Sequence, residues 1–407
     1  MINITEKNIN AFLHYGWLPR TDIDPPFPED WIPTTTSSKK PCLKTGGEIL
    51  RQAVLKSVEG HKKVIVPLSG GLDSRAILAI LREQNFDILA VTVGTPGTYD
   101  YDYGKMIAQK ANVEHVGIDI TKTDISTPEL VNTARMTGDW TNIIEVYFNL
   151  LINQRYGDFP VASGFLGDFL GGAYRGRDYG NWNETKKVFA EHNNNTWNNL
   201  TDKQFDPTEV IDIEVNNNVL SPYEQLVFKT RHTCSLRPTA FTDNFNYVLP
   251  FKDKDWVQFI LSHRSDDFKN SNLYHQILLD NWPELFKLPT KNFKGANLES
   301  STATKKLHKF KNRVRNKIGR TFPHLSESLI GIDPMVNYTN FHTQIEKNEN
   351  MRSVIIKNIK DLEKRNVTTW LNWQEINKDL EKKLNFKEGL KLMALANLEI
   401  NLKSSQN

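Results

Sequence analysis

The stretch VIVPLSGGLDS at residues 64–74 decides the fold that we expect for this chain. Its first part, residues 64–68, is a short run of mostly β-branched apolar residues, which is typical of a strand buried on both faces. A turn with two adjacent glycines follows, and residues 73–84 then carry apolar side chains at helical spacing. The pattern predicts a strand, a glycine-rich loop and a helix in direct succession.

The alternation of strand and helix continues on both sides of this stretch. Strands are predicted at residues 88–93, 115–120 and 159–162, and helices at residues 48–58, 102–111 and 143–153. Strands that alternate with helices across short loops predict an α/β fold with a doubly wound, mostly parallel sheet. Ligands bind such a sheet beyond the carboxyl ends of its strands, so the glycine-rich loop is expected at the ligand site.

The loop has the chemistry of an anion site. Gly70 and Gly71 allow the backbone to approach a phosphate closely, and Ser69 and Ser74 supply hydroxyl groups. The start of the following helix adds free N–H groups and the positive end of a dipole. Asp73 would repel a phosphate unless a divalent cation such as Mg²⁺ lies between them. The alternative is a tight structural turn whose Asp and Ser cap the helix.

A second glycine-rich stretch, ASGFLGDFLGGAY at residues 162–174, follows the fourth predicted strand. The first loop matches the PP-loop of the ATP pyrophosphatases and lacks the lysine of the GxxxxGK[ST] loop. The second stretch resembles the SGEGSDELFGGY segment of asparagine synthetases. Weaker likenesses to that family lie in residues 50–58, in VTVG at 91–94, in LPFKD at 249–253 and in LPTKNFKG at 288–295. Over residues 45–300 the chain thus resembles the C-terminal synthetase domain of asparagine synthetases.

The resemblance implies roles for particular residues. The backbone of Leu68 and Val93 would frame the adenine of ATP, and Gly164 would lie near the ribose or α-phosphate. The pyrophosphate would be bound by Ser69, Gly70, Gly71 and Ser74. Asp73 and Asp168 would hold Mg²⁺. Lys291 or Lys294 would neutralise charge on the adenylate and the departing phosphate, although either could equally be an exposed loop lysine.

The activity that the resemblance implies is an asparagine synthase-like, ATP-dependent carbon–nitrogen ligase. A small-molecule carboxylic acid would be adenylated with release of pyrophosphate, and ammonia or an amine would then displace AMP. Phe165, Asn246 and Val248 stand where the family has Glu, Glu and Arg, which makes L-aspartate a doubtful substrate. The glutaminase half of the family needs a cysteine after Met1, where this chain has Ile2. We therefore expect no glutaminase activity, with ammonia taken free or from a separate glutaminase subunit.

Two other functions remain open, namely a PP-loop tRNA-modifying enzyme and a nucleotide-binding protein without catalysis. A nucleic-acid partner is not favoured, because 51 basic residues stand against 48 acidic ones and the 2 cysteines lie far apart. Residues 305–315 predict a basic amphipathic helix. Its apolar stripe is expected to dock on the body of the protein, and the alternative is contact with an anionic partner.

The chain is expected to comprise an N-terminal arm (1–44), the ATP-binding domain (45–300) and a helical C-terminal extension (301–407). Prolines in the first 41 residues should break any long element there and leave an arm packed on the main body. No apolar run approaches the length of about 18 to 20 residues that spans a bilayer. We expect a cytoplasmic protein without a membrane partner.

Overall fold

The computed structural model describes residues 2–177, 179–195, 200–240, 245–264, 272–321, 341–382, 384 and 386–406. Its sheet has five strands in the order β3-β2-β1-β4-β5, and every neighbouring pair is parallel. The strands are β1 (Lys63–Pro67), β2 (Asp87–Gly94), β3 (Glu114–Asp119), β4 (Val161–Ala162) and β5 (Tyr247–Val248). In register, Ile65 of β1 lies between Leu89 of β2 and Val161 of β4. The predicted doubly wound, parallel α/β fold is confirmed.

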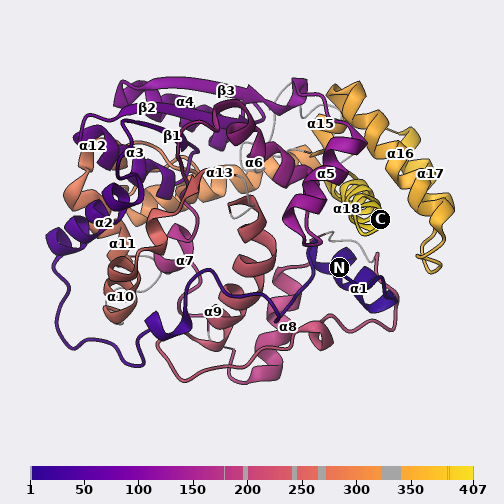
Figure 1. The fold of residues 1–407 in the computed structure, drawn as a ribbon, viewed down its shortest axis with the longest axis horizontal. Coiled ribbons are helices and arrows are strands. Elements are labelled where there is room, and N and C mark those ends of the chain that lie inside the picture. The colour runs from indigo at the N-terminus through magenta and orange to yellow at the C-terminus, as the bar shows by residue number, and fades with distance from the viewer. Residues whose placement is uncertain are drawn as a thin grey trace.

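Helices surround this sheet and extend well beyond it (Figure 1). In chain order they are α1 (Glu6–Tyr15), α2 (Leu43–Ser57), α3 (Asp73–Glu83), α4 (Tyr99–Ala111), α5 (Thr127–Thr137), α6 (Ile143–Tyr156), α7 (Gly167–Leu170), α8 (Trp182–His192), α9 (Pro222–Leu226), α10 (Lys254–Ser262), α11 (Asn272–Asn281), α12 (Pro283–Phe286), α13 (Thr302–Thr321), α15 (Phe341–Lys347), α16 (Glu349–Arg365), α17 (Trp373–Glu381) and α18 (Phe386–Ser404). The last three lie together beyond α5, at one end of the long axis of the molecule (Figure 1).

Side chains of β1 alternate between two hydrophobic cores, one on each face of the sheet. Val64 and Val66 belong to the core that contains α2, α3, α10 and α11. Ile65 belongs to the other core, with residues of α1, α5, α6, α16 and α18. The alternation follows from the two-residue period of a strand. Because both faces are covered, the strand is apolar throughout, which is why its sequence was readable as a buried strand.

Several expectations differ from the structure in detail. The strand expected at residues 159–162 is confined to Val161–Ala162, and β5, α5 and α1 were not predicted. The expectation that prolines break any long element up to residue 41 is wrong for α1, because the prolines begin at Pro19, after that helix has ended. The arm does lie on the body, since Phe12 and Leu13 of α1 are fully buried.

The basic helix at residues 305–315 is present as part of α13, but its expected docking is wrong. Leu307 and Phe310 were expected against the body, yet their exposed fractions are 51% and 62%. The side chain that is buried instead is that of Asn312, which donates a hydrogen bond to the Lys294 carbonyl. Polar contacts to the 291–295 loop therefore orient the helix, and its apolar stripe points to solvent.

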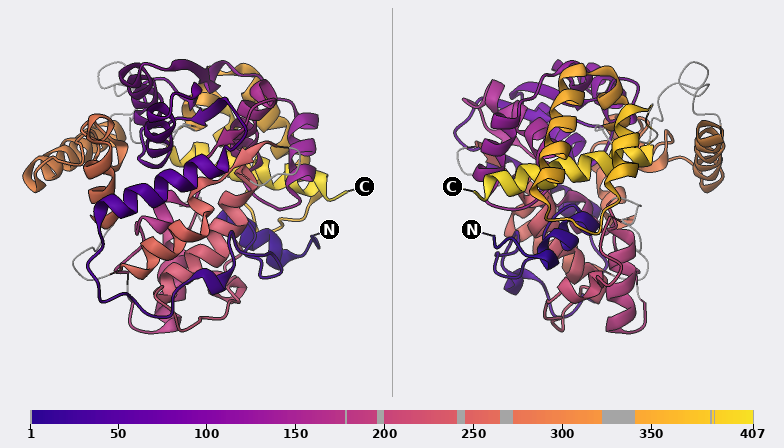
Figure 2. Two further views of the ribbon diagram at one scale, coloured as in Figure 1. Left: turned by 60° about the vertical axis from the view of Figure 1, so that its left-hand side comes forward. Right: turned by 90° about the vertical axis from the view of Figure 1, so that its right-hand side faces the viewer.

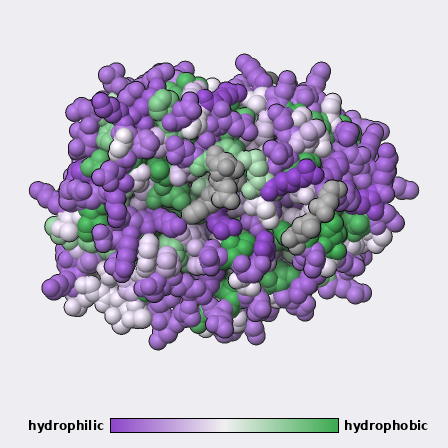
Figure 3. Space-filling view, in the orientation of Figure 1, coloured by the Kyte–Doolittle hydropathy of each residue, from purple (hydrophilic) through white to green (hydrophobic). Residues whose placement is uncertain are grey.

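The surface is otherwise mostly polar where it can be seen. The face turned towards the viewer in Figure 3 is mainly hydrophilic, with small separated hydrophobic patches. Among the described residues, no helix combines the length and the apolar character needed to cross a membrane.

Candidate active site

Two glycine-containing loops leave neighbouring strands at the same edge of the sheet. Residues 69–74 follow β1, and residues 163–168 follow β4, which pairs with it. Strand order β1-β4 therefore brings together two segments that are about ninety residues apart in the chain. This edge, beyond the carboxyl ends of parallel strands, is where ligands bind in doubly wound sheets.

Glycines allow the two loops to touch at Asp73. A Cβ atom at Gly164 would lie 2.9 Å from Asp73 Cβ and 3.0 Å from Ser74 N. One at Gly167 would overlap the Asp73 carboxyl group itself. Leu166, between these glycines, has φ of +71°, a conformation that non-glycine residues rarely adopt. Such backbone strain tends to gather at functional sites, where the surrounding structure enforces it.

The first loop presents hydrogen-bond donors in a fixed arrangement. The Gly71 N–H donates to Ser69 Oγ at 3.2 Å, and the Ser69 N–H faces Ser74 Oγ at 3.4 Å. No side chain caps the start of α3, which follows directly. Its first N–H groups and helix dipole are thus available to an anion, as the sequence predicted for a phosphate.

The carboxylates of Asp73 and Asp168 lie close enough to interact, and their pKa values move in opposite directions. Burial and the nearby charge of Asp168 raise the pKa of Asp73 to about 7. Burial also acts to raise the pKa of Asp168, but the hydrogen bond and charge of His232 and the charge of Arg231 outweigh it and lower that pKa to about 2. Asp73 therefore lies where negative charge is unfavourable without a cation.

The residues fit a divalent cation only when phosphate completes its coordination. No cluster of three or more His, Cys, Asp or Glu side chains that could hold a metal occurs in the described part of the chain. A pair of carboxylates beside an uncapped helix start is instead the kind of donor set that binds Mg²⁺ together with substrate phosphates. Burial and the charge of Asp168 make an ionised Asp73 unfavourable without a cation, which agrees with this donor set.

Of the two candidate lysines, Lys291 has its side chain beside the first loop. Its Cε lies 3.7 Å from where a Cβ at Gly71 would be, and its Nζ pairs with Asp100 Oδ1 at 2.8 Å. Lys294 contributes backbone instead, since its carbonyl accepts bonds from Tyr99 and Asn312. The loop that carries both is tied to the site by the Lys291 N–H, which donates to Gly70 O at 3.0 Å.

Residues 46–203, which contain both glycine loops, match the family model described as asparagine synthase. This part of the chain is similar to the asparagine synthase family. That family uses ATP in general. No curated protein matches the chain.

The two residues expected around the adenine lie directly after β1 and on β2. Leu68 follows β1, and its N–H and carbonyl are both engaged by β2, the former with Val91 O at 2.9 Å and the latter with Thr92 Oγ1 at 2.9 Å. Val93 pairs with Ile118 near the end of β2 and is half-buried. Both residues lie at the correct edge of the sheet, and their contact with adenine remains a prediction.

The three positions that depart from the family are not alike. Phe165 is 9% exposed and packs its ring against His232, so the acidic side chain of the family is replaced by a buried apolar one. Asn246 and Val248 use their carbonyls to accept from Val161 and Ser163, which holds β5 against β4. Asn246 is exposed. All three charged side chains of the family pattern are thus absent at these positions.

A cluster of cationic and phenolic groups lies beside Asp168. The Tyr174 hydroxyl donates to Asp168 Oδ2 at 3.3 Å, and Arg231 donates to the same hydroxyl. Arg177 lies over the rings of Tyr174 and Tyr223 at 5.3 and 5.2 Å. Neither arginine pairs with an acidic side chain in the described part of the chain. Guanidinium groups in this position can bind a carboxylate.

Sequence reasoning missed three side chains that hold the site together. The Tyr274 hydroxyl donates to Asp73 Oδ1 at 3.0 Å, and the buried Arg75 donates to the carbonyls of Leu285 and Pro289. His232 lies 3.4 Å from Asp168 Oδ1. No local pattern marks these three side chains, because each acts on a residue far away in the chain.

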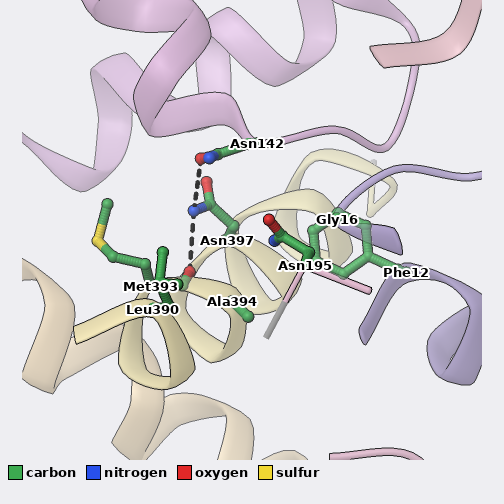
Figure 4. A pocket seen from close by; sticks show the side chains of 8 residues that line it. All are labelled: Phe12, Gly16, Asn142, Asn195, Leu390, Met393, Ala394 and Asn397. Atoms are coloured by element: carbon green, nitrogen blue, oxygen red, sulfur yellow. Dashed lines mark hydrogen bonds between the residues drawn. The ribbon is translucent and has the colours of Figure 1, made fainter. Parts of the chain in front are cut away.

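A small pocket elsewhere in the molecule has no part in this site. It lies between α1 and α18, holds about 10 Å³, and is bordered by Phe12, Asn142 and Asn397 among others (Figure 4). Asn397 donates to Asn142 Oδ1 there at 2.9 Å (Figure 4). A volume that size accommodates one water molecule at most, and the contacts are those of helix packing.

Proposed function

We propose that the chain is an ATP-dependent ligase that adenylates a small carboxylic acid and transfers ammonia or an amine to it. The observation that carries the proposal is the meeting of Asp73 and Asp168 beside an uncapped helix start and Lys291. A protein that only bound a nucleotide would gain nothing from burying Asp73 against a second carboxylate, because that burial is unfavourable.

In the first step a carboxylate oxygen of the acid attacks the α-phosphorus of ATP, and the bond from that phosphorus to the bridging oxygen breaks. The hydroxyls of Ser69 and Ser74 and the start of α3 would hold the departing pyrophosphate. Lys291 would place its charge beside the same group. A bound Mg²⁺ would neutralise charge on the leaving pyrophosphate and align it.

In the second step the nitrogen attacks the acyl carbon, the amide bond forms, and AMP leaves with the electron pair of the broken C–O bond. The attacking nitrogen loses a proton, which the departing AMP phosphate or water would accept. Holding both reactants on rigid strand ends would account for much of the rate, since orientation removes entropy from the barrier.

The acid itself is proposed to be one other than L-aspartate. Buried Phe165 offers no charge to an α-amino group, and the cations of Arg177 and Arg231 lie beside Tyr174. An acid with a second anionic group and an apolar or uncharged body fits such a lining better. The nitrogen is proposed to be free ammonia, a primary amine, or ammonia from a separate glutaminase subunit.

ATP–pyrophosphate exchange in the presence of a panel of acids tests the proposal. Asp168→Asn should lower exchange by orders of magnitude, with a nearly unchanged melting curve and a higher demand for Mg²⁺. Asp158→Asn is the matched control, because Asp158 is exposed in the turn before β4. Near-normal exchange by Asp168→Asn would show that the second loop is only structural, and no exchange with any acid would favour nucleotide binding without catalysis.

A further inference from the structure

Helix α13 packs on the protein through its polar face. The Asn312 amide donates to Lys294 O at 3.2 Å, and His308 Nδ1 lies 3.2 Å from the same carbonyl. Nearer the start of the helix, Lys305 donates to Leu298 O at 2.8 Å and lies 4.2 Å from the centre of the Phe293 ring. The face that a surface helix normally turns to solvent is here the face that holds it in place.

The apolar face of α13 is turned to solvent. Leu307, Phe310, Val314 and Ile318 recur every three or four residues, which aligns them in one stripe. Their exposed fractions are 51%, 62%, 41% and 42%. Among the large hydrophobic side chains that are exposed in the described residues, these four outnumber the rest, which are Ile4 and Val215. A contiguous exposed stripe of this kind marks an interaction surface.

Positive charge borders the stripe on both sides. The helix has eight lysines and arginines and no acidic residue over Thr302–Thr321. At 100° per residue, Lys306 and Arg313 fall on one flank of the stripe and Lys311 on the other. None of these three pairs with an acidic side chain among the described residues. The whole chain carries a net charge of only +3, so this helix concentrates cationic charge that the rest of the protein balances.

We propose that α13 lies flat on an anionic phospholipid surface. The stripe would enter the boundary between headgroups and acyl chains, and the flanking lysines and arginines would reach the lipid phosphates. An apolar stripe between two cationic edges is the pattern of helices that bind in the plane of a membrane. The sequence-based expectation of no membrane partner assumed that the apolar face of this helix is buried, whereas it is exposed to solvent.

The shape of the molecule favours a broad surface as the partner. Both views in Figure 2 show α13 standing out from the body, so that a flat bilayer can reach it without meeting the remaining helices. A nucleic acid would be held through its phosphates by the cations alone, which would leave Phe310 and its neighbours in water. The lipid surface satisfies the charges and the stripe together.

Vesicle co-sedimentation with the full chain tests the proposal. Binding is expected to vesicles of phosphatidylcholine with phosphatidylglycerol, to weaken as salt is raised, and to be absent with phosphatidylcholine alone. The double variant Phe310→Ser, Val314→Ser should bind at least ten-fold more weakly. Lys306→Gln should weaken binding roughly five-fold, as expected for one charge near an anionic surface.

The matched control is Val215→Ser, which removes an apolar side chain of similar exposure outside the stripe and should leave binding unchanged. Circular dichroism melting curves establish that each variant is folded. The proposal is overturned if the wild-type chain ignores anionic vesicles, or if the double variant binds them as well as the wild type. It is also overturned if the stripe is needed only for binding single-stranded RNA or for self-association measured by sedimentation velocity. None of these results depends on whether the chain adenylates an acid.

Discussion

At the scale of the residue, Asp73 shows how binding and stability oppose each other in this site. Its pKa is about 7 in the folded protein against an ordinary value of 3.8, because it is buried and close to Asp168. Below about pH 4 the carboxyl group of Asp73 is protonated in both the folded and unfolded states, so it does not lower the free energy of unfolding. Between pH 4 and pH 7, Asp73 is ionised in the unfolded chain but still protonated in the folded protein, so the free energy of unfolding falls as pH rises. Above pH 7 the destabilisation is complete.

Asp73→Asn should therefore raise the melting temperature of the ligand-free protein at pH 8 and have little effect at pH 4, while abolishing pyrophosphate release. Thermal unfolding in the presence of a chelator, at several pH values, measures the first effect. Saturating ATP and Mg²⁺ should shrink the difference, because a cation at Asp73 removes the cost of its charge. A variant that is less stable than the wild type at pH 8 would contradict this assignment.

The two lysines of the 291–295 loop can be separated by replacing each with alanine. Lys291→Ala should lower pyrophosphate exchange by about 100-fold or more, as expected when one donor to developing charge is removed. It should also lower the melting temperature, because Asp100, only 3% exposed, loses its partner. Lys294→Ala should change both quantities little, since the loop uses its backbone carbonyl. Equal losses in the two variants would mean that Lys294 also reaches the phosphates.

At the scale of the element, α11 contributes to the site through one hydroxyl group. Tyr274→Phe removes the hydrogen bond to Asp73 Oδ1, and a change of that kind behind a metal ligand costs about 10- to 100-fold in metal affinity. We expect the Mg²⁺ dependence of exchange to shift by such a factor. Tyr247→Phe is the control, because it also removes one hydrogen bond of a tyrosine hydroxyl, to Asn149 O, and touches neither Asp73 nor Asp168 through that bond. A shift with both variants would point to general loosening of the fold.

The elements that sequence reasoning found are those with a local signature. Strands β1 and β2 are runs of mostly apolar residues, β3 alternates Val116 and Ile118 with other residues, and the helix after β1 starts at a glycine turn. Strand β5 has two residues, too few to show a period, and α1 was hidden by the prolines that follow it. Tyr274 lies 201 residues from Asp73, and no local pattern marks that contact.

The site was predictable for a different reason than the fold. Asp73 and Asp168 could be paired only through the resemblance, since composition and periodicity do not reveal that β1 and β4 are neighbours. For helix α13, the secondary structure was predicted correctly but its orientation was not. Its period was read correctly, but the rule that apolar stripes face inward does not hold where polar contacts to Lys294 fix the helix.

At the scale of the whole molecule, the C-terminal helices share a core with the sheet. The hydrophobic cluster that includes Ile65 and Leu89 of the sheet also includes Ile355 of α16 and Leu395 of α18. Polar contacts reinforce this packing, because Asn397 of α18 accepts from the Ile144 N–H at 3.0 Å and donates to Asn142. The division at residue 300 stays a prediction, and because the core is shared we expect the two parts to unfold together.

Asn397→Ala tests that cooperativity. The side chain is 2% exposed and bridges α18 to the start of α6, so its loss leaves the Ile144 N–H without its partner in a buried place. An unsatisfied buried group costs about 1 to 3 kcal/mol, and the unfolding midpoint in urea should fall accordingly. Asn132→Ala, on the exposed side of α5, is the control and should change little. If the two parts form one cooperative unit, circular dichroism and tryptophan fluorescence will report the same single transition in the wild type and in Asn397→Ala. Two separated transitions, with only one shifted by the variant, would show that the C-terminal helices are an independent domain docked on the synthetase fold.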